Sequence, residues 1–302
     1  MASPQRTALI TGCSKGSAGE AHALEWASRG LRVFATARSL KSIQHLEEKG
    51  IEVLTLDVTS TESIAALREE ITKRTGGKLD ILFNNAGVMY EAPAIEEDDK
   101  AVRQMYNANV FGLFDMVKAF TPLLMVAKPD PSQPPTIINV ASILAVMPYI
   151  FSASYNASKA AVASYSDTLR VELAPLGIKV VTLYMGIVGT GLFKMDAMNL
   201  PADSLYFDFV PAWRKRGEDH AKSGMKPADF AKGVADAVLK GSALGRGEYM
   251  WKGAKSTLVW ALHAFGWRKI FDSTTESEMG WNDAKLKRSL AEKKEQAVAK
   301  KG

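Results

Sequence analysis

Residues 7–19, which read TALITGCSKGSAG, decide the fold class. Residues 7–11 form an apolar run typical of a buried β-strand, and a helical pattern begins at Ala18. The glycines between them let the backbone turn tightly and approach a ligand closely, and the N–H groups that begin a helix attract an anion. A strand, a glycine-rich turn and a helix in this order favour a pyrophosphate site, although a tight turn that binds nothing has the same pattern.

The rest of the chain continues the alternation of strands and helices. Predicted strands span residues 7–11, 31–35, 52–56, 79–84, 136–141 and 179–183. Predicted helices span residues 18–29, 40–49, 61–75, 98–127 and 153–174. Runs such as ILF, IINV and VVTL are apolar on both faces, as parallel strands covered by helices on two sides must be. These patterns predict a doubly wound α/β fold of the Rossmann type, whose ligands lie at the carboxyl ends of the strands.

The composition is that of one globular unit. The chain has 302 residues, of which 47% are apolar and 24% charged. No linker rich in Pro, Gly or Ser divides it near the middle, and the Pro-rich stretch 128–135 is short enough for a surface loop. We therefore expect one domain over residues 1–251, with a long, irregular substrate lid at about 191–225, and a C-terminal helical extension over residues 252–302.

Cysteine usage and hydropathy narrow the cellular setting. Cys13 is the single cysteine, which excludes an internal disulfide and a zinc site of clustered cysteines, so no metal is expected. The N-terminal apolar run is too short for the core of a signal peptide, and nowhere do about 18 apolar residues follow one another. The sequence predicts a cytoplasmic protein, or one at the periphery of a membrane.

The net charge of +5 is concentrated at the C-terminus. Residues 282–302 hold seven Lys and Arg against three Asp and Glu, and so carry four of the five net charges. A solvated helix is the ordinary explanation of such a tail, and contact with a membrane surface or a nucleic acid is the alternative. Because aromatic and basic residues do not alternate as in a nucleic-acid groove, no nucleic-acid partner is expected.

The end of the second strand indicates which dinucleotide would bind. An NAD-binding protein of this fold commonly places Asp or Glu there to hold the ribose 2′-hydroxyl. Here Ala37 and then Arg38 occupy that place. A guanidinium binds a 2′-phosphate through two N–H donors, and Lys15 would add a second positive charge, unless it is simply a solvated loop lysine. The sequence favours NADPH over NADH.

The stretch YNASK, residues 155–159, contains a tyrosine and a lysine whose spacing suggests a catalytic pair. Tyr155 and Lys159 lie four residues apart on a predicted helix, so their Cβ atoms are about 5–6 Å apart on one face. Among the eight tyrosines, Tyr155 alone has a lysine at this spacing, and Ser142 precedes it by 13 residues. Other short motifs accompany this pair along the chain. In order they are TGxxxG at 11–16, NNAG at 84–87, Asn109 in NANVFG, Ser142 in NVAS, the Tyr155/Lys159 pair and GIVGT at 186–190. Over residues 7–251 these motifs resemble the short-chain dehydrogenase/reductase family of the classical type.

The resemblance implies catalytic roles for four residues. Tyr155 would be the general acid that protonates a carbonyl oxygen, with its pKa lowered by the Lys159 cation and the oxidised nicotinamide. Lys159 would also hydrogen-bond the nicotinamide ribose. Ser142 would orient the carbonyl and stabilise charge on its oxygen, and Asn109 would hold a water that links Lys159 to solvent. Each also has a purely structural interpretation, in which Ser142 caps a turn and Asn109 satisfies a backbone group.

The resemblance also implies a set of residues that bind NADPH. In and after the first strands these are Gly12, Ser14, Lys15, Gly16, Gly19 and Arg38. Asp57 and Val58 would contact the adenine, unless Asp57 only begins a helix, and Asn85, Ala86 and Gly87 would form the wall beneath the adenosine ribose. Val188 and Thr190 would hold the carboxamide and the phosphate.

The sequence departs from the family pattern at two places. The glycine-rich loop is one residue longer than the common TGxxxGxG, so either Gly16 or Ser17 takes the place of the middle glycine. The usual Pro-Gly after the sixth strand is Met185-Gly186, which makes the wall against the nicotinamide softer and more apolar. These departures affect the pose of the cofactor rather than the catalytic residues.

The lid and the extension bear on the substrate. The lid combines apolar bulk with Arg214, Lys215 and Arg216, which suggests a lipophilic ketone, neutral or anionic, or merely a basic exposed face. The extension carries residues 253–271, GAKSTLVWALHAFGWRKIF, which predict either an interfacial helix with basic edges or a helix packed across the domain. Together with KLDILFNNAG and MKPADFAK, this arrangement resembles the fungal NADPH-dependent 1-acyldihydroxyacetone phosphate reductases.

That resemblance implies a lipid ketone as substrate and contact with endoplasmic reticulum or lipid droplets. Relatives that reduce ketones in polyketide and other secondary-metabolite pathways leave a second kind of substrate open. In the family, helices 98–127 and 153–174 commonly form dimer faces, so the resemblance also allows a homo-oligomer. A catalytically silent NADPH-binding sensor or scaffold is the alternative of another class, and the intact Ser142, Tyr155 and Lys159 argue against it.

Overall fold

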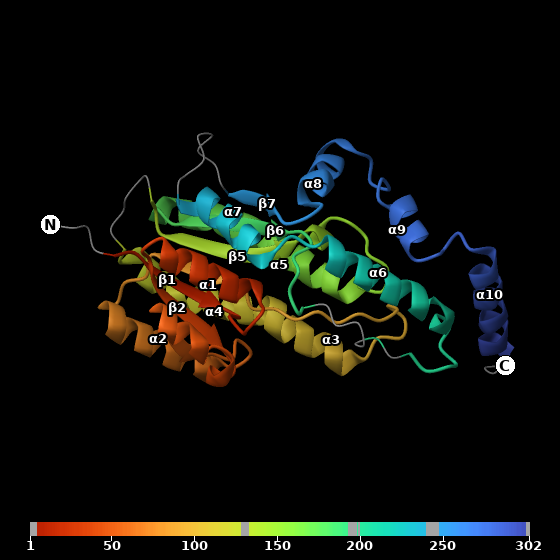
Figure 1. Ribbon diagram of the computed structural model, residues 1–302, viewed down its shortest axis with the longest axis horizontal. Helices are drawn as coiled ribbons and strands as arrows, with labels where there is room; N and C mark the ends of the chain where they lie inside the picture. The colour runs from red at the N-terminus through yellow and green to blue at the C-terminus, as the bar shows by residue number, and fades with distance from the viewer. Residues whose placement is uncertain (1–4, 128–132, 193–197, 199, 240–247, 300–302) are drawn as a thin grey trace.

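Seven parallel strands form one sheet at the centre of the molecule (Figure 1). This computed structural model describes residues 5–127, 133–192, 198, 200–239 and 248–299. The strand order is β3-β2-β1-β4-β5-β6-β7, and the connection from β3 to β4 crosses the sheet to reverse the direction of winding. The strands are β1 (Thr7–Thr11), β2 (Arg32–Ala37), β3 (Glu52–Thr55), β4 (Ile81–Asn84), β5 (Thr136–Ser142), β6 (Lys179–Met185) and β7 (Tyr249–Lys252). The predicted doubly wound parallel sheet is confirmed.

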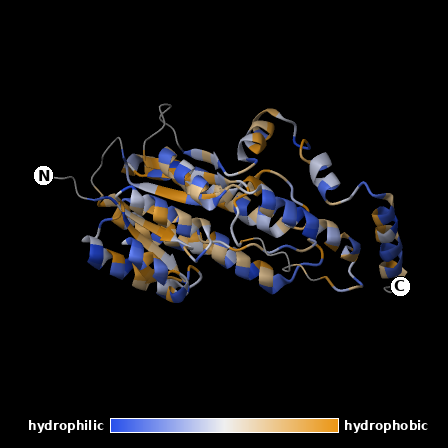
Figure 2. Cartoon of the chain, in the orientation of Figure 1, coloured by the Kyte–Doolittle hydropathy of each residue, from blue (hydrophilic) through white to orange (hydrophobic). Residues whose placement is uncertain are grey.

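Helices cover both faces of the sheet, and each face has its own buried core. On one face α1 and α7 pack together over Trp26 and Phe230, and on the other α2, α4 and α5 pack over residues such as Phe120 and Val162. The helices are α1 (Ala18–Ser28), α2 (Thr61–Thr75), α3 (Asp99–Tyr106), α4 (Gly112–Met125), α5 (Ala153–Leu173), α6 (Val210–Ser223), α7 (Pro227–Leu239), α8 (Ser256–Phe265), α9 (Asp272–Glu278) and α10 (Ala284–Ala299). Hydropathy colouring shows mostly apolar strands beneath two-toned helices (Figure 2).

Several predicted elements need correction. Residues 40–49 form two short 3₁₀ turns rather than an α-helix. The predicted helix 98–127 is interrupted by a π-helical turn at Asn107–Phe111, a feature that often marks functional sites. Helix α7 and strand β7 were not predicted from the sequence. The lid was expected to be irregular, but α6 occupies much of it. Most of the predicted Pro-rich loop, residues 128–132, and lid residues 193–197 and 199 lie outside the described residues.

Helix α5, which carries Tyr155 and Lys159, is fixed to the sheet by buried polar contacts. Asn139 of β5 accepts from Asn84 Nδ2 at 2.9 Å and donates to Ser166 Oγ of α5 at 3.0 Å. All three side chains are buried, so breaking either bond would leave a polar group without water. These two bonds therefore fix the position of α5 relative to β4 and β5.

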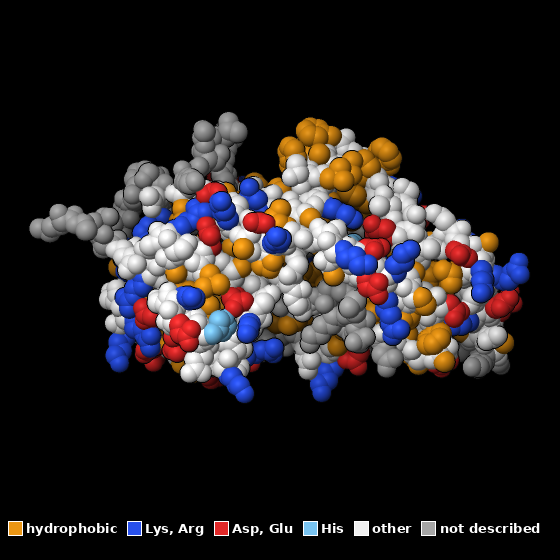
Figure 3. Space-filling model, viewed as in Figure 1, with side chains coloured by type: hydrophobic (Ala, Val, Ile, Leu, Met, Phe, Trp, Pro, Cys, Tyr) orange, Lys and Arg blue, Asp and Glu red, His pale blue; other side chains and the backbone are white. Residues whose placement is uncertain are grey.

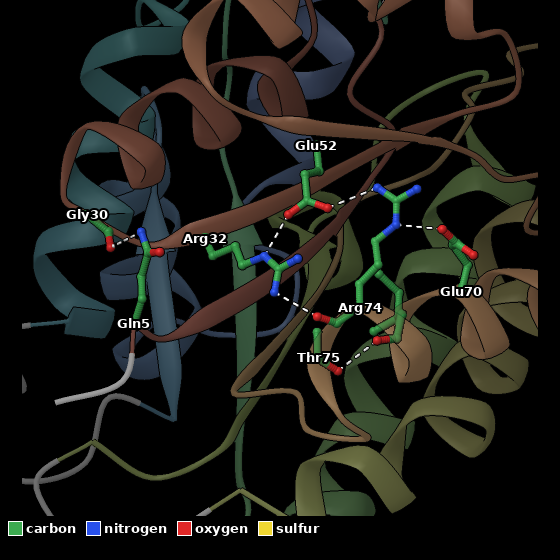
Figure 4. A network of polar contacts seen from close by, with 8 residues as sticks. Gln5, Gly30, Arg32, Glu52, Glu70, Arg74 and Thr75 are labelled. Carbon is green, nitrogen blue, oxygen red and sulfur yellow. Dashed lines mark hydrogen bonds and ion pairs between the residues drawn. The ribbon is translucent and has the colours of Figure 1, made fainter.

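An ion-pair network lies at the amino-terminal ends of β2 and β3, opposite the carboxyl ends of the strands (Figure 4). Glu52 of β3 binds Arg32 of β2 at 2.6 Å and Arg74 of α2 at 2.9 Å. Arg74 also binds Glu70 at 2.6 Å, and Arg32 donates to the Arg74 carbonyl at 2.8 Å. This network joins β2, β3 and α2 far from the carboxyl ends of the strands, so it supports the fold rather than the site.

The C-terminal extension is attached to the lid rather than freely solvated. Helix α10 packs Leu286 and Leu290 against an apolar cluster that includes Phe209 and Trp213 of the lid region. Its Lys293 forms an ion pair with Asp208 at 3.4 Å and donates to the Ser204 carbonyl at 3.1 Å. A solvated helix was the ordinary explanation of the basic tail. In the structure α10 is largely exposed and contacts the lid through one face.

One helical stretch among the described residues, Asp99–Met125, is long and apolar enough in composition to cross a membrane. Half of its most apolar window is buried inside the protein, and α4 packs on the sheet and on α2. This is the behaviour of a core helix.

Candidate active site

Two glycines bring α1 against the carboxyl ends of β1 and β4. Gly12 has a left-handed φ of +75°, and a Cβ there would lie 2.8 Å from the Ala86 Cα. A Cβ on Gly19 would lie 2.4 Å from the Gly12 carbonyl oxygen. Any larger residue would push the helix N-terminus away from the strand ends, so both positions require glycine for packing, and Gly12 requires it for its backbone conformation as well.

The question of which residue takes the place of the middle glycine is settled by backbone geometry. Gly16 has φ +79° and faces open space, whereas Ser17 is extended and caps α1, accepting from Glu20 N at 3.1 Å. Of the two residues, Gly16 therefore has the left-handed conformation that a tight glycine turn needs. Its N–H donates to the Glu20 carboxylate at 2.5 Å, so the helix start already holds one negative charge.

The residues predicted to read the 2′-phosphate lie at the ends of β1 and β2. Lys15 N donates to the Ser42 carbonyl at 3.1 Å, and the Ser14 and Ser42 hydroxyls are 3.3 Å apart, which brings the loop after β2 beside the glycine-rich loop. Arg38 is exposed on the same side. Ser42 was missed by sequence analysis, because a serine in a loop after a strand carries no distinctive pattern.

Asp57 and Val58 follow β3 at the same edge of the sheet. The Asp57 carboxylate accepts from Thr59 N and Thr59 Oγ1, and these bonds, with a weaker contribution from Arg38, lower its pKa. Asp57 therefore shapes the turn before α2 and does not itself begin the helix, whose N-cap is Ser60. Its proximity to Arg38 is also compatible with a place in a nucleotide pocket.

The segment after β4 is held to the glycine-rich loop by hydrogen bonds. Thr11 Oγ1 accepts from Asn85 N at 3.0 Å and from Ala86 N at 2.9 Å, and Asn85 Nδ2 donates to the Thr11 and Gly12 carbonyls. Thr11 is an organising residue that the TGxxxG motif contains but that the predictions did not assign. These bonds fix the wall on which a ribose would lie.

Lys159 is buried against the sheet. Only 6% of the residue is exposed, and its Nζ donates to the Val140 carbonyl at 2.8 Å. Desolvation lowers the pKa of the amine to about 8. Gly87 lies beside it, since a Cβ on Gly87 would be 3.6 Å from Nζ.

Tyr155 lies beside Ser142 and the Lys159 amine. Its ring centroid is 6.0 Å from Lys159 Nζ. Burial raises the pKa of the phenol, a hydrogen bond with Ser142 opposes this, and Glu91 adds to the rise. Desolvation is the largest of these effects, so the chain's own groups keep the phenol in its proton-bearing form at neutral pH, and the expected lowering by Lys159 is not among them.

Ser142 and Asn109 have structural contacts as well as a place in the site. Ser142 Oγ accepts from Leu144 N at 3.1 Å and caps the turn after β5. Asn109, in the π-helical turn, accepts from Val88 N at 2.8 Å and donates to Val88 O at 2.9 Å and to Ser158 Oγ at 3.2 Å. Asn109 therefore joins the π-helical turn to the residue before Lys159, a link that spacing alone did not reveal.

Val188 and Thr190 lie at the carboxyl end of β6. Gly189 N donates to the Met225 carbonyl at 2.9 Å, and Thr190 N donates to Val188 O at 2.8 Å. A Cβ on Gly186 would lie 2.3 Å from the Ala254 carbonyl oxygen, so the Met-Gly departure keeps the glycine that this close approach needs. The predicted cofactor residues thus line one edge of the sheet, from β3 through β1 to β6.

A sequence model described as short chain dehydrogenase matches residues 6–199. The chain belongs to this family. The short-chain dehydrogenase virD of Hypocrea virens is 40% identical over 276 residues, which cover 90% of this chain and 92% of that protein. The NADPH-dependent 1-acyldihydroxyacetone phosphate reductase of Schizosaccharomyces pombe is 40% identical over 210 residues, covering 68% of this chain and 69% of that protein.

Solved structures agree with the family assignment. A short-chain dehydrogenase from Streptomyces avermitilis has a TM-score of 0.73 at 25% identity, covering 95% of this chain and 98% of that one. A short-chain dehydrogenase from Burkholderia cenocepacia in complex with NADP has a TM-score of 0.68 at 24% identity, covering 90% and 97%, and shows the same fold. The chain is an oxidoreductase of the short-chain dehydrogenase family, with a strand-end edge that fits a dinucleotide.

Replacement of Lys159 by Met tests how the buried amine behaves. Because the pKa of Lys159 is lowered, the unfolded chain binds more protons than the folded chain between about pH 8 and pH 10, and the wild type gains stability as pH rises through this window. Lys159→Met should therefore be more stable than the wild type near pH 7, and this advantage should shrink by about 2 kcal/mol toward pH 10.

Urea unfolding at several pH values measures the difference, with Lys118→Met, an exposed lysine on α4, as the control. A stability difference for Lys159→Met that stays constant with pH would contradict the assignment of a desolvated amine.

Proposed function

We propose that the chain reduces a ketone to a secondary alcohol with NADPH. The observation that carries this proposal is the buried cluster in which Ser142 hydrogen-bonds the Tyr155 phenol beside the Lys159 amine, at the strand ends where the dinucleotide edge terminates. NADPH would supply the hydride when bound. A ketone is the substrate class that needs one proton donor and one carbonyl-orienting hydroxyl together.

The chain's own residues would divide the chemistry among them. Tyr155 donates its phenolic proton to the carbonyl oxygen, and burial keeps that proton in place until the reaction demands it. Ser142 donates to the same oxygen and stabilises the charge that develops there. Lys159, held by Val140 O, places a cation near the phenolate that forms, and Asn109 and Ser158 hold the helix turn beside it. The residues from Gly12 to Gly19, with Asn85 to Gly87 and Val188, bind the cofactor.

Tyr155→Phe removes the proton donor and little else. NADPH affinity, measured by fluorescence titration, should stay within about threefold, while kcat for any accepted ketone should fall by roughly 10² or more, since a positioned acid contributes about 10²–10⁴. Tyr165→Phe, on the same helix, is the matched control and should keep kcat. A Tyr155→Phe enzyme that retains more than about a tenth of kcat would show that another group protonates the ketone.

We also propose that NADPH is preferred over NADH because Arg38 and Lys15 lie where the 2′-phosphate would bind and Ala37 leaves no carboxylate there. The Schizosaccharomyces pombe relative, described as NADPH-dependent, supports this preference. Replacing Ala37 with Asp and Arg38 with Ala should invert or strongly reduce the ratio of kcat/KM for NADPH to that for NADH, because the carboxylate repels the phosphate and accepts from the 2′-hydroxyl. An unchanged ratio would place phosphate recognition elsewhere, and Lys15→Ala would then be measured.

A lipophilic ketone such as a 1-acyldihydroxyacetone phosphate is the proposed substrate. Support comes from the Schizosaccharomyces pombe relative and from the apolar character of the lid, whose Leu200, Phe209 and Trp213 belong to a buried apolar cluster. An NADPH-oxidation screen over acyl-dihydroxyacetone phosphates, aromatic polyketide ketones and steroids identifies the class. Steady turnover of any ketone would also remove the alternative of a catalytically silent sensor.

The outer face of α8 supports a further proposal, that the protein lies at the periphery of an anionic lipid surface. Figure 3 shows an apolar patch over the region of α8. On α8, Phe265 is 82% exposed and Leu258 59%, and Trp267, which follows the helix, is 70% exposed. Arg268 and Lys269 are exposed beside them, which gives the patch the basic edge of an interfacial helix. The inner face of α8 packs Val259 in a buried cluster, and the proposal assigns the lipid contact to the outer face alone.

Vesicle flotation tests this surface. Because Val259 belongs to a core cluster, exposed residues are substituted rather than the extension removed. The wild type should float with vesicles rich in phosphatidylserine and less so in high salt, whereas Phe265→Ser with Trp267→Ser should remain at the bottom with reductase activity intact. Val171→Ser, an exposed apolar residue on α5, is the control. A wild type that does not float under any of these conditions would leave α8 as a packed helix only.

A further inference from the structure

A buried carboxylate near the active site has no role in the chemistry described above. Glu91 lies in the loop after β4, and its side chain is 4% exposed. It accepts from Ser152 Oγ at 2.7 Å and from Arg216 Nη2 of α6 at 3.2 Å, and Trp213 of α6 also hydrogen-bonds it. One carboxylate thus joins three separate segments: the loop after β4, the start of α5 and the lid helix.

Arg216 depends on this carboxylate. Its side chain is 2% exposed, its Nη2 also donates to the Ile150 carbonyl at 3.1 Å, and its guanidinium lies 3.8 Å above the Tyr149 ring. Within the part of the chain that the structure describes, Arg216 Nε and Nη1 have no hydrogen-bond partner. Glu91 is therefore the group that balances this buried charge, and its removal would leave the cation unpaired.

Glu91 and Arg216 contact Ser152 and Ile150, which lie in the segment between Ser142 and Tyr155. Phe151 has a left-handed φ of +69°, which a non-glycine residue adopts only when its surroundings impose it. Ala92 N, next to Glu91, donates to the Phe151 carbonyl at 2.8 Å. Glu91 and its neighbours thus hold this strained turn from one side and Arg216 holds it from the other.

The N-terminus of α5 completes the link to the proton donor. Ser152 precedes α5, and its hydroxyl donates to Glu91 instead of capping the helix. The first turn of α5 contains no acidic residue, so Glu91 supplies the negative charge that a helix start favours. Tyr155 lies in that same turn, where a shift of the helix start moves the phenol directly.

We infer that Glu91 is a positioning residue for the proton donor: paired with Arg216, it fixes the turn between Ser142 and Tyr155 and couples the seating of lid helix α6 to the placement of the phenol. Glu91 touches neither substrate nor cofactor and acts through Ser152 and the helix start. This inference rests on the proposed ketone reduction, in which Ser142 and Tyr155 address one oxygen.

Glu91 also acts on Tyr155 through its charge. Other titratable or charged groups face the pair and the phenol from each neighbouring element: Tyr149, His220, Asp219, Lys255, Glu278 and Lys159. Burial, with smaller effects of Lys255 and Arg216, lowers the pKa of His220 to about 4, and burial raises the pKa of Tyr149. Burial lowers the pKa of the Lys159 amine to about 8 and raises the pKa of the Tyr155 phenol, to which the Glu91 charge adds. Loss of the Glu91 charge would therefore lower the pKa of the phenol, and the oxidised nicotinamide of bound NADP would lower it in the same direction.

The test uses the reverse reaction, oxidation by NADP of the alcohol that corresponds to a ketone accepted in the screen. In this direction the phenol must give up its proton, so kcat rises with pH through the pKa of the site. Glu91→Gln keeps the size of the side chain and an acceptor for Ser152. It should lower the plateau kcat by about tenfold and shift the rise toward acid pH by about half a unit or more, with NADPH affinity unchanged.

Two further variants separate position from charge. Ser152→Ala breaks the link but keeps the carboxylate, so the plateau kcat should fall severalfold while the pH of the rise stays in place. Glu96→Gln is the matched control, because Glu96 lies in the same loop and bonds the lid through Ser204 Oγ at 2.6 Å without contacting α5. Glu96→Gln should keep both the plateau kcat and the pH of the rise.

Failure of the inference differs from failure of the proposed function. A wild type that turns over no ketone or alcohol would overturn the function itself. If the wild type is active, a Glu91→Gln enzyme with wild-type kcat and an unmoved pH profile overturns the inference. If Glu91→Gln does not fold, Ser152→Ala decides, and a plateau kcat within twofold of wild type overturns the inference.

Discussion

The buried amine of Lys159 is the constraint on which the site depends. An ammonium in an apolar interior is costly, and here a single carbonyl, Val140 O, binds it while burial lowers the pKa of the amine to about 8. The fold must hold this group beside Tyr155, whose phenol is itself desolvated. Stability that a methionine would provide is given up for a cation beside the phenol on which the proposed reduction would leave negative charge, as is common where function opposes stability.

The rest of the structure keeps that arrangement rigid. Asn139 bonds α5 to the sheet through Ser166, Asn109 bonds the π-helical turn to Ser158, and Gly12 and Gly19 let α1 approach the strand ends. From the other side, Glu91 and Arg216 fix the strained turn before α5. The polar side chains that make these bonds are buried, so loss of one partner would leave the other without water, and the site is correspondingly sensitive to single substitutions.

Much of this could be predicted from the sequence because local patterns specify it. Apolar runs such as residues 136–141 predict buried parallel strands, and the glycine-rich loop after β1 predicts the dinucleotide edge. The spacing of Tyr155 and Lys159 predicts their common helix face, which is confirmed. These features depend on residues close together in the chain.

The features that were missed depend on contacts between distant residues. The pair of Glu91 and Arg216 joins positions 125 residues apart, and neither residue type is unusual in its own surroundings. The short strand β7 forms because β6 offers it a partner, and Tyr249 at its start is exposed, so no alternation marks it. The tail helix α10 reads as polar, and its contacts through Leu286 and Leu290 exist only because the lid presents an apolar cluster.

The central proposal is that NADPH transfers a hydride to the carbonyl carbon of a ketone while the chain donates a proton to the carbonyl oxygen. It is tested most directly by reducing an accepted ketone with NADPH deuterated at one of its two C4 positions and locating the label by NMR. The account predicts that deuterium from one of the two C4 epimers, and not from the other, appears on the carbinol carbon of the alcohol, because a fixed site presents one face of the nicotinamide. NADPH that binds but transfers label to no product, or label from both epimers in equal amounts, would contradict it.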